Sequence, residues 1–148
     1  MILISACLAG VNCKYSGDNN YNEKIVELLK KGDAILVCPE QMGGLPTPRI
    51  GAEIKVIDGK RYVFMKDGTD VTNQFEKGAK ETLEIAKKVN ATKAILKSRS
   101  PSCGVGIIYD GTFTKTKIDG DGITAKLLRD NGIEVISSDD FIEGKIDI

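Results

Sequence analysis

Three short apolar runs and a fourth strand-like stretch predict a buried sheet. The runs are Ile2 to Ala6, Ala34 to Val37 and Ala94 to Leu96, and the fourth stretch is Ile133 to Ile136. Strands that are covered on both faces read as continuous apolar runs, whereas strands with one wet face alternate between apolar and polar residues. We therefore expect these segments to pair in a mostly parallel sheet.

Helical patterns lie between and after these runs. The first spans about residues 22–31, with Asn20 or Asn22 as its cap; the second follows Thr72, and the third spans about residues 122–130. The side chains expected to face the core are Ile25, Leu28 and Leu29 in the first helix, Phe75, Ala79, Leu83 and Ala86 in the second, and Leu127 and Leu128 in the third.

The alternation of strands and helices predicts an α/β fold, with a mostly parallel central sheet flanked by helices in a single Rossmann-like domain over residues 1–148. Two Asp-Gly pairs predict short antiparallel hairpins, because their residues adopt the positive φ angles of tight turns. Asp58-Gly59 lies between Glu53 to Ile57 and Lys60 to Met65, and Asp110-Gly111 lies between Ile107 to Tyr109 and Thr112 to Thr114.

Composition narrows the possible functions. The chain has 148 residues, 21 basic and 21 acidic side chains and no histidine. Without imidazole, proton transfer must use other groups, and Ser-His-Asp or Cys-His relays are excluded. The charges are evenly spread, so we expect no long nucleic acid as a partner.

No apolar run approaches the roughly 18 residues of a membrane span, and no basic leader precedes the first run. We expect a cytoplasmic protein with no membrane partner; its oligomeric state is left open.

Three of the four cysteines follow predicted strands. Cys7 and Cys38 come directly after the first two strands, and Cys103 lies in the loop after the third. The carboxyl ends of parallel strands share one edge of a sheet, so these thiols are expected to converge there. In a reducing compartment such thiols serve as metal ligands, catalytic groups or buried apolar residues. An iron–sulfur cluster or thiolate zinc is the expected centre. Cys13 is a possible fourth zinc ligand, although five residues separate it from Cys7.

Two loops carry further candidate chemistry. In the stretch Cys38 to Arg49, Glu40 is either a solvated carboxylate or, beside a buried centre, a general acid or base. Ser98, Ser100 and Ser102 precede Cys103 and are either hydroxyl donors or loop caps.

At these residues the chain resembles the thiouracil desulfurase family. The resemblance rests on Ser5 to Gly10, Val37 to Arg49, Gly68 to Thr72, Lys97 to Gly104 and Tyr109 to Phe113, and covers nearly the whole chain. It implies an oxygen-sensitive [4Fe-4S] cluster on Cys7, Cys38 and Cys103, whose open iron receives the sulfur of a thiolated pyrimidine such as 2- or 4-thiouracil. It further implies that Glu40 is the acid–base residue, that Ser102 handles protons or orients the substrate, and that Cys13 is a spectator or accessory thiol. Ser100, Gly43, Gly44 and Tyr15 are the expected substrate contacts. The family's Arg-Tyr-Asp-Gly stretch reads Lys14 to Gly17 here.

The mechanism expected from this resemblance is non-redox desulfuration. Water activated by Glu40 attacks the thiocarbonyl carbon, and backbone amides of Gly10, Gly43, Gly44 and Gly104 are expected to donate to the cluster sulfurs or the substrate. The alternative is a non-catalytic nucleotide-binding module with a structural thiolate metal site. Thiol redox chemistry is disfavoured, since no C-x-x-C pair is present and no thiol is expected at a helix start. The physiological substrate is left open between a free base, a nucleoside and a tRNA nucleotide.

Overall fold

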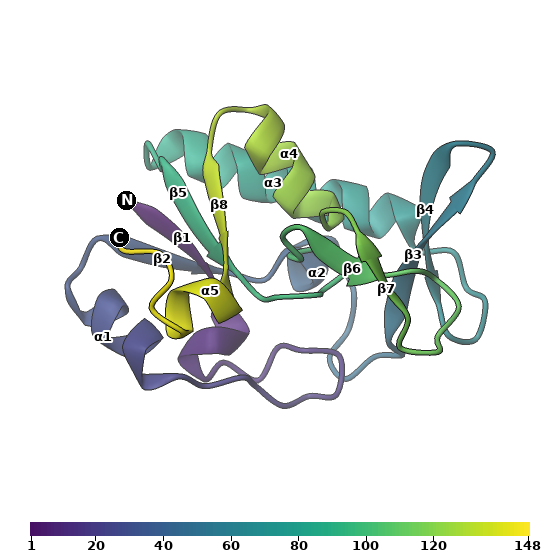
Figure 1. The fold of residues 1–148 in the computed structure, drawn as a ribbon, viewed down its shortest axis with the longest axis horizontal. Helices are drawn as coiled ribbons and strands as arrows, with labels where there is room; N and C mark the ends of the chain where they lie inside the picture. The colour runs from purple at the N-terminus through teal and green to yellow at the C-terminus, as the bar shows by residue number, and fades with distance from the viewer.

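A parallel sheet of four strands forms the centre of the computed structural model, which describes residues 1–148 (Figure 1). The strand order is β2-β1-β5-β8, where β1 is Ile2–Ser5, β2 is Ala34–Val37, β5 is Lys93–Leu96 and β8 is Glu134–Ser137. All three pairings are parallel. The predicted α/β architecture is therefore confirmed, and β2, β1 and β5 are direct neighbours.

Helices cover both faces of this sheet (Figure 1). Leu3, Ala94 and Leu96 pack beneath α3 (Thr72–Lys88) and α4 (Ile123–Asp130), whereas Ile4, Ile95 and Ile136 face η1 (Ala6–Ala9), α1 (Glu23–Lys30) and α5 (Ser138–Ile142). Successive side chains of a strand point to opposite faces, so continuous apolar strands supply both core layers.

The helices begin and pack largely as their sequences predict. The Asn22 side chain caps α1 by accepting from the Lys24 N–H at 3.0 Å. The predicted stripe on α3 is buried throughout. In α1 only Ile25 is fully buried, and in α4 Leu128 is buried whereas Leu127 packs at the margin of the core.

The first predicted hairpin is confirmed. Strands β3 (Ala52–Ile57) and β4 (Lys60–Met65) pair antiparallel, and Asp58 and Gly59 have φ angles of 52° and 76°. Both signs match the type I′ turn that Asp-Gly favours.

The second hairpin has a different register. Strand β6 (Ile107–Tyr109) pairs with β7 (Lys117–Asp119), so the predicted turn at Asp110-Gly111 and strand at Thr112 to Thr114 are wrong. These residues belong to a loop over 110–116. Asp110 accepts from the Thr112 N–H, and Glu53 Oε1 accepts from the N–H groups of Gly111 and Phe113 at 3.0 and 3.1 Å. The Gly111 N–H is thus hydrogen-bonded to the Glu53 side chain on β3, and the Asp-Gly pair does not close a hairpin.

A short helix, α2 (Pro39–Met42), packs against α3 through two glycines. A Cβ placed on Gly43 would lie 2.0 Å from the Gln74 carbonyl oxygen, and one on Gly78 would lie 1.9 Å from that of Pro39. Only glycine permits this approach of two backbones. No helix of the chain has the length and apolar character that crossing a membrane requires.

Candidate active site

Thiols from three adjacent strand ends line one cleft. Cys7 follows β1, Cys38 follows β2, and Cys103 lies in the loop after β5; all three border an open cavity of about 580 Å³. The expected convergence follows from the strand order, because β2, β1 and β5 end at the same edge of the sheet. The Ser5 hydroxyl joins two of these ends by accepting from the Lys97 N–H at 2.9 Å.

Local helices fix the first two thiols. Cys7 lies in the single turn of η1, which ends at Gly10 with φ 96°. Cys38 is the N-cap residue of α2, and Pro39 occupies the first helical position, where its missing N–H costs nothing. The expectation that no thiol lies at a helix start is therefore wrong. A four-residue helix with a proline at its first position gives little periodic signal in a sequence.

The start of α4 fixes the loop that carries Cys103. The N–H of Ile123 donates to the Pro101 carbonyl and that of Thr124 to the Ser102 carbonyl, both at 2.9 Å. These bonds satisfy donors that the first turn of a helix leaves free. Ser102 is 1% exposed and Cys103 4% exposed, so both side chains are buried as deeply as the core.

Cys13 is a fourth thiol in the cleft wall, buried between Cys7 and Cys38. Its hydrogen bond lowers the pKa of the Cys7 thiol to about 6 and that of the Cys38 thiol to about 7, in each case against the opposing effect of burial. The pKa of Cys13 itself is raised by these same hydrogen bonds to Cys38 and Cys7. Burial raises the pKa of Cys103 to about 12. Because Cys13 has a single thiol proton, it can favour the metal-binding thiolate of Cys7 or that of Cys38, one at a time.

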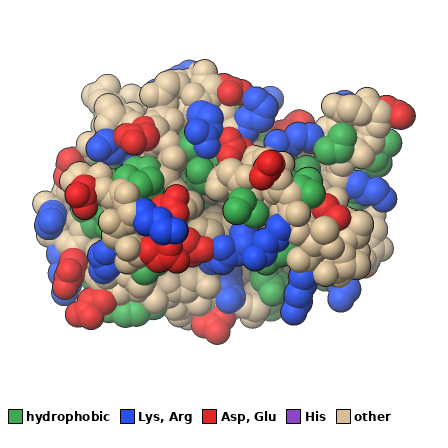
Figure 2. Space-filling view, in the orientation of Figure 1, with side chains coloured by type: hydrophobic (Ala, Val, Ile, Leu, Met, Phe, Trp, Pro, Cys, Tyr) green, Lys and Arg blue, Asp and Glu red, His purple; other side chains and the backbone are tan.

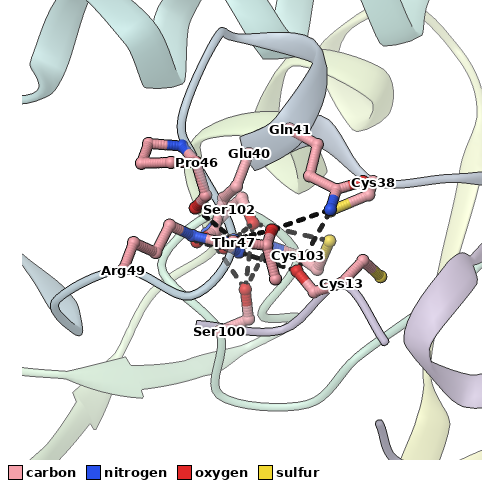
Figure 3. A network of polar contacts seen from close by, with 10 residues as sticks. All are labelled: Cys13, Cys38, Glu40, Gln41, Pro46, Thr47, Arg49, Ser100, Ser102 and Cys103. Atoms are coloured by element: carbon pink, nitrogen blue, oxygen red, sulfur yellow. Dashed lines mark hydrogen bonds and ion pairs between the residues drawn. The ribbon is translucent and has the colours of Figure 1, made fainter. Parts of the chain in front are cut away.

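Glu40 and Ser102 are in direct contact (Figure 3). The Ser102 Oγ donates to Glu40 Oε2 at 2.7 Å and lies 3.6 Å from the Cys103 sulfur. Ser100 Oγ lies 3.0 Å from Ser102 Oγ. The carboxylate, both hydroxyls and the Cys103 thiol therefore occupy one continuous part of the cleft wall.

Arg49 completes this network, although no role is predicted for it from the sequence (Figure 3). Its guanidinium forms an ion pair with Glu40 at 3.0 Å, and the two side chains are only 3% and 16% exposed. Eight residues separate Arg49 from Glu40 in the sequence, and no local pattern pairs the two side chains.

Some predicted contacts do not lie at the cleft. Ser100 and Tyr15 line it, with Tyr15 at its exposed mouth, but Gly43 and Gly44 do not. Gly43 instead packs against α3, which accounts for the glycine there. The amides expected to face the cluster are bonded within the backbone: Gly10 to Cys7, Gly43 to Pro39, Gly44 to Gln41 and Gly104 to Ser100. Those four donors are therefore not available to a ligand.

The mouth of the cleft is basic. Lys14, Lys66 and Lys115 line it and have no acidic partner, while Glu53 is occupied by two backbone N–H groups. Over most of the face drawn in Figure 2, basic and acidic side chains are interspersed. The local surplus of positive charge favours an electron-rich or anionic ligand. Phe113, which sequence reasoning also missed, extends from the 110–116 loop into the wall of the cleft.

The donor set suits an iron–sulfur cluster. The chain offers soft thiols and no imidazole at this cleft, which is the chemistry that such clusters use. No three His, Cys, Asp or Glu side chains are arranged to hold a single metal ion. A four-iron cluster binds each cysteine through a different iron, so it needs its thiolates further apart than one ion does. The geometry therefore does not favour the alternative of a structural zinc site.

The α/β fold thus brings cysteines from three strand ends and a serine–glutamate pair into one cleft. Residues 2–140 match the sequence model of the 2-thiouracil desulfurase family, and the chain belongs to that family. It is 45% identical over 147 residues to the uncharacterized protein YbbK of Bacillus subtilis (strain 168), covering 95% of this chain and 97% of YbbK. Among solved structures it resembles a [4Fe-4S]-dependent thiouracil desulfidase, TudS, with a TM-score of 0.87, 40% identity, and coverage of 96% of this chain and 93% of that one. The resemblance expected from the sequence is confirmed.

Proposed function

We propose that this chain is an iron–sulfur-dependent enzyme that removes sulfur from thiouracil. Its membership of the 2-thiouracil desulfurase family and its likeness to TudS, a [4Fe-4S]-dependent thiouracil desulfidase, support the cofactor and the reaction. The observation that carries the proposal is the common cleft, which three cysteines from adjacent strand ends line together with the Glu40–Ser102 pair.

Cys7, Cys38 and Cys103 would hold the cluster, and Cys13 would remain free. When bound, a [4Fe-4S] cluster on three cysteines supplies a Lewis-acidic iron that prefers sulfur to oxygen. The thiols reach the cleft from three separate elements, so the folded sheet is what assembles the ligand set.

Glu40 and Ser102 handle the protons. Glu40 Oε2 accepts from Ser102 at 2.7 Å and is placed to take up the proton that water releases when it attacks the thiocarbonyl carbon. The same carboxyl group then returns that proton to the departing sulfur. Burial of Ser102 keeps bulk water out of this contact.

The overall reaction is hydrolytic and balanced. Thiouracil and one water give uracil and hydrogen sulfide: the carbon–sulfur double bond is replaced by a carbon–oxygen double bond, and both water hydrogens leave on sulfur. No electrons are gained or lost, so no reductant is needed.

The experiment that tests this function is sulfide release. The protein is reconstituted with iron and sulfide under anaerobic conditions and incubated with 2-thiouracil and 4-thiouracil, with uracil formation followed by chromatography. We expect equal amounts of uracil and sulfide. Protein with a full cluster that converts neither compound would contradict the proposal.

Two finer points belong to the same proposal. We place the enzyme in the cytoplasm, where reducing conditions keep its four free cysteines from forming disulfides. We expect a small thiolated pyrimidine as substrate in preference to long nucleic acid, because the chain's 21 basic side chains are balanced by 21 acidic ones.

A further inference from the structure

Arg49 binds one carboxylate oxygen of Glu40 and makes no hydrogen bond to the other. An arginine–carboxylate pair is often two parallel bonds, one to each oxygen. Here Nε and Nη2 of Arg49 both donate to Oε1, at 3.1 and 3.0 Å. Oε2 receives nothing from Arg49 and accepts instead from Ser102. The two oxygens of Glu40 therefore have different partners.

The guanidinium is itself held in place through all five of its N–H donors (Figure 3). Beyond the two bonds to Glu40, Nη2 donates to the Cys13 carbonyl at 3.0 Å, and Nη1 donates to the Pro46 carbonyl and to Thr47 Oγ1 at 3.2 and 3.0 Å. Arginine has no further donors to offer. Because two of these partners are backbone carbonyls from separate loops, Arg49 has no room to rotate without losing bonds.

Counting donors and acceptors gives the hydroxyl chain a direction. Ser100 Oγ accepts from the N–H groups of Ser102 and Cys103, at 3.2 and 3.0 Å, which occupies both of its lone pairs. Its own proton must then go to Ser102 Oγ. The single proton of Ser102 goes to Glu40 Oε2 at 2.7 Å in preference to the Cys103 sulfur at 3.6 Å. Protons thus run from Ser100 through Ser102 to one defined oxygen.

We propose that Arg49 is a positioning residue for the desulfuration reaction: by holding Oε1, it keeps Oε2 of Glu40 directed at Ser102 as the only proton acceptor of the chain. This inference rests on the proposed function. Without the guanidinium, Oε1 loses both partners and the carboxylate can turn away from Ser102. A misplacement of about 1 Å at a reacting group lowers turnover by roughly 10²-fold.

A double-mutant cycle tests the inference. Arg49→Gln and Arg49→Lys are expected to lower kcat about 10²-fold and to leave KM within about twofold, because Arg49 does not orient the substrate itself. Lysine keeps the charge but lacks the planar fork, so it should not rescue turnover. In the Glu40→Gln background, Arg49→Gln should lower kcat no further. A second, equal loss in that background would overturn the proposal, since Arg49 would then act independently of Glu40.

Two controls separate positioning from damage. Arg129→Gln removes an arginine whose side chain is 50% exposed on α4 and should leave kcat unchanged. Iron and acid-labile sulfide are measured for each variant, and kcat is expressed per cluster.

An anaerobic crystal structure of Arg49→Gln provides the readout that does not depend on activity. We expect Glu40 Oε2 to have moved out of hydrogen-bond distance of Ser102. A Glu40–Ser102 contact unchanged from 2.7 Å would overturn the inference. If fully loaded wild-type protein released no sulfide, the proposed function would fail, and the crystal structure would still decide the role of Arg49.

Discussion

Gly43 and Gly78 lie in backbone contact between α2 and α3. A Cβ on Gly78 would come within 1.9 Å of the Pro39 carbonyl oxygen. Pro39 directly follows Cys38 and lies in α2 together with Glu40. The closeness of two helix backbones therefore sets the position of both a predicted ligand and the predicted acid–base group.

Gly78→Ala should displace α2. The added methyl group must push the Pro39 carbonyl away, and overpacking of this kind costs typically about 1–3 kcal/mol. We expect a loss of unfolding free energy in that range, measured by urea denaturation, together with weaker cluster retention. Gly51→Ala is the matched control, since a Cβ there meets only the Tyr15 ring at 3.7 Å. Equal stability of Gly78→Ala and wild type would contradict this packing.

Glu40→Gln should separate cluster binding from turnover. The amide keeps the size of the side chain but cannot take up a proton, and loss of a general acid–base group lowers rates by roughly 10²–10⁴-fold. We expect wild-type iron content and a kcat reduced by about that factor, measured as sulfide release. Glu76→Gln, on the exposed side of α3, should behave as wild type. An unchanged kcat in Glu40→Gln would remove this residue from the mechanism.

Glu53→Ala should loosen the loop that carries Phe113. Phe113 and Lys115 have φ angles of 58° and 61°, a conformation that costs a non-glycine residue about 1–3 kcal/mol. Glu53 holds the loop by accepting hydrogen bonds from two of its backbone N–H groups. Without them we expect KM for thiouracil to rise about tenfold and kcat to change little, because binding is lost equally in the ground and transition states. Glu53→Gln retains an acceptor oxygen and should raise KM less than Glu53→Ala does. A fall in kcat at constant KM would contradict this role.

The Arg99–Asp139 pair should contribute to stability only above acidic pH. The hydrogen bond from Arg99 lowers the pKa of Asp139 below its ordinary value of 3.8. A carboxylate with a lowered pKa stabilises the fold above its unfolded pKa, and that contribution is lost as pH falls through the folded value. Asp139→Asn should therefore unfold at lower urea than wild type at pH 7, and the difference should shrink below about pH 4. A difference that grows on acidification would contradict this assignment. Asp130→Asn, from the exposed Lys126–Asp130 pair, is the control and should change the midpoint little.

Much of the fold could be predicted because its signals are local. Apolar runs at Ile2 to Ala6 and Ala94 to Leu96 mark strands covered on both sides, and the stripe through Phe75 and Leu83 marks the long helix. The common edge for Cys7, Cys38 and Cys103 followed from parallel pairing alone. No pattern within the sequence states which loop meets which.

The remainder depends on contacts between distant segments. The loop over 110–116 takes its path from Glu53, more than fifty residues earlier, so the local Asp-Gly signal misled. Gly43 is a predicted substrate contact, yet its close approach to α3 at Gly78 accounts for the glycine at this position. Arg49 ends the stretch from Cys38 that carries candidate chemistry, but only the folded loop brings its guanidinium to Glu40.

The most direct test of the central claim is the iron content of four single cysteine variants. Cys7→Ser, Cys38→Ser, Cys103→Ser and Cys13→Ser are reconstituted anaerobically beside wild type, and iron and acid-labile sulfide are measured per chain. We predict close to four of each for wild type and Cys13→Ser, and a marked loss in the other three, because three thiolates hold the cluster. Full loading of Cys103→Ser, or a loss in Cys13→Ser as large as in Cys7→Ser, would contradict the assigned ligand set.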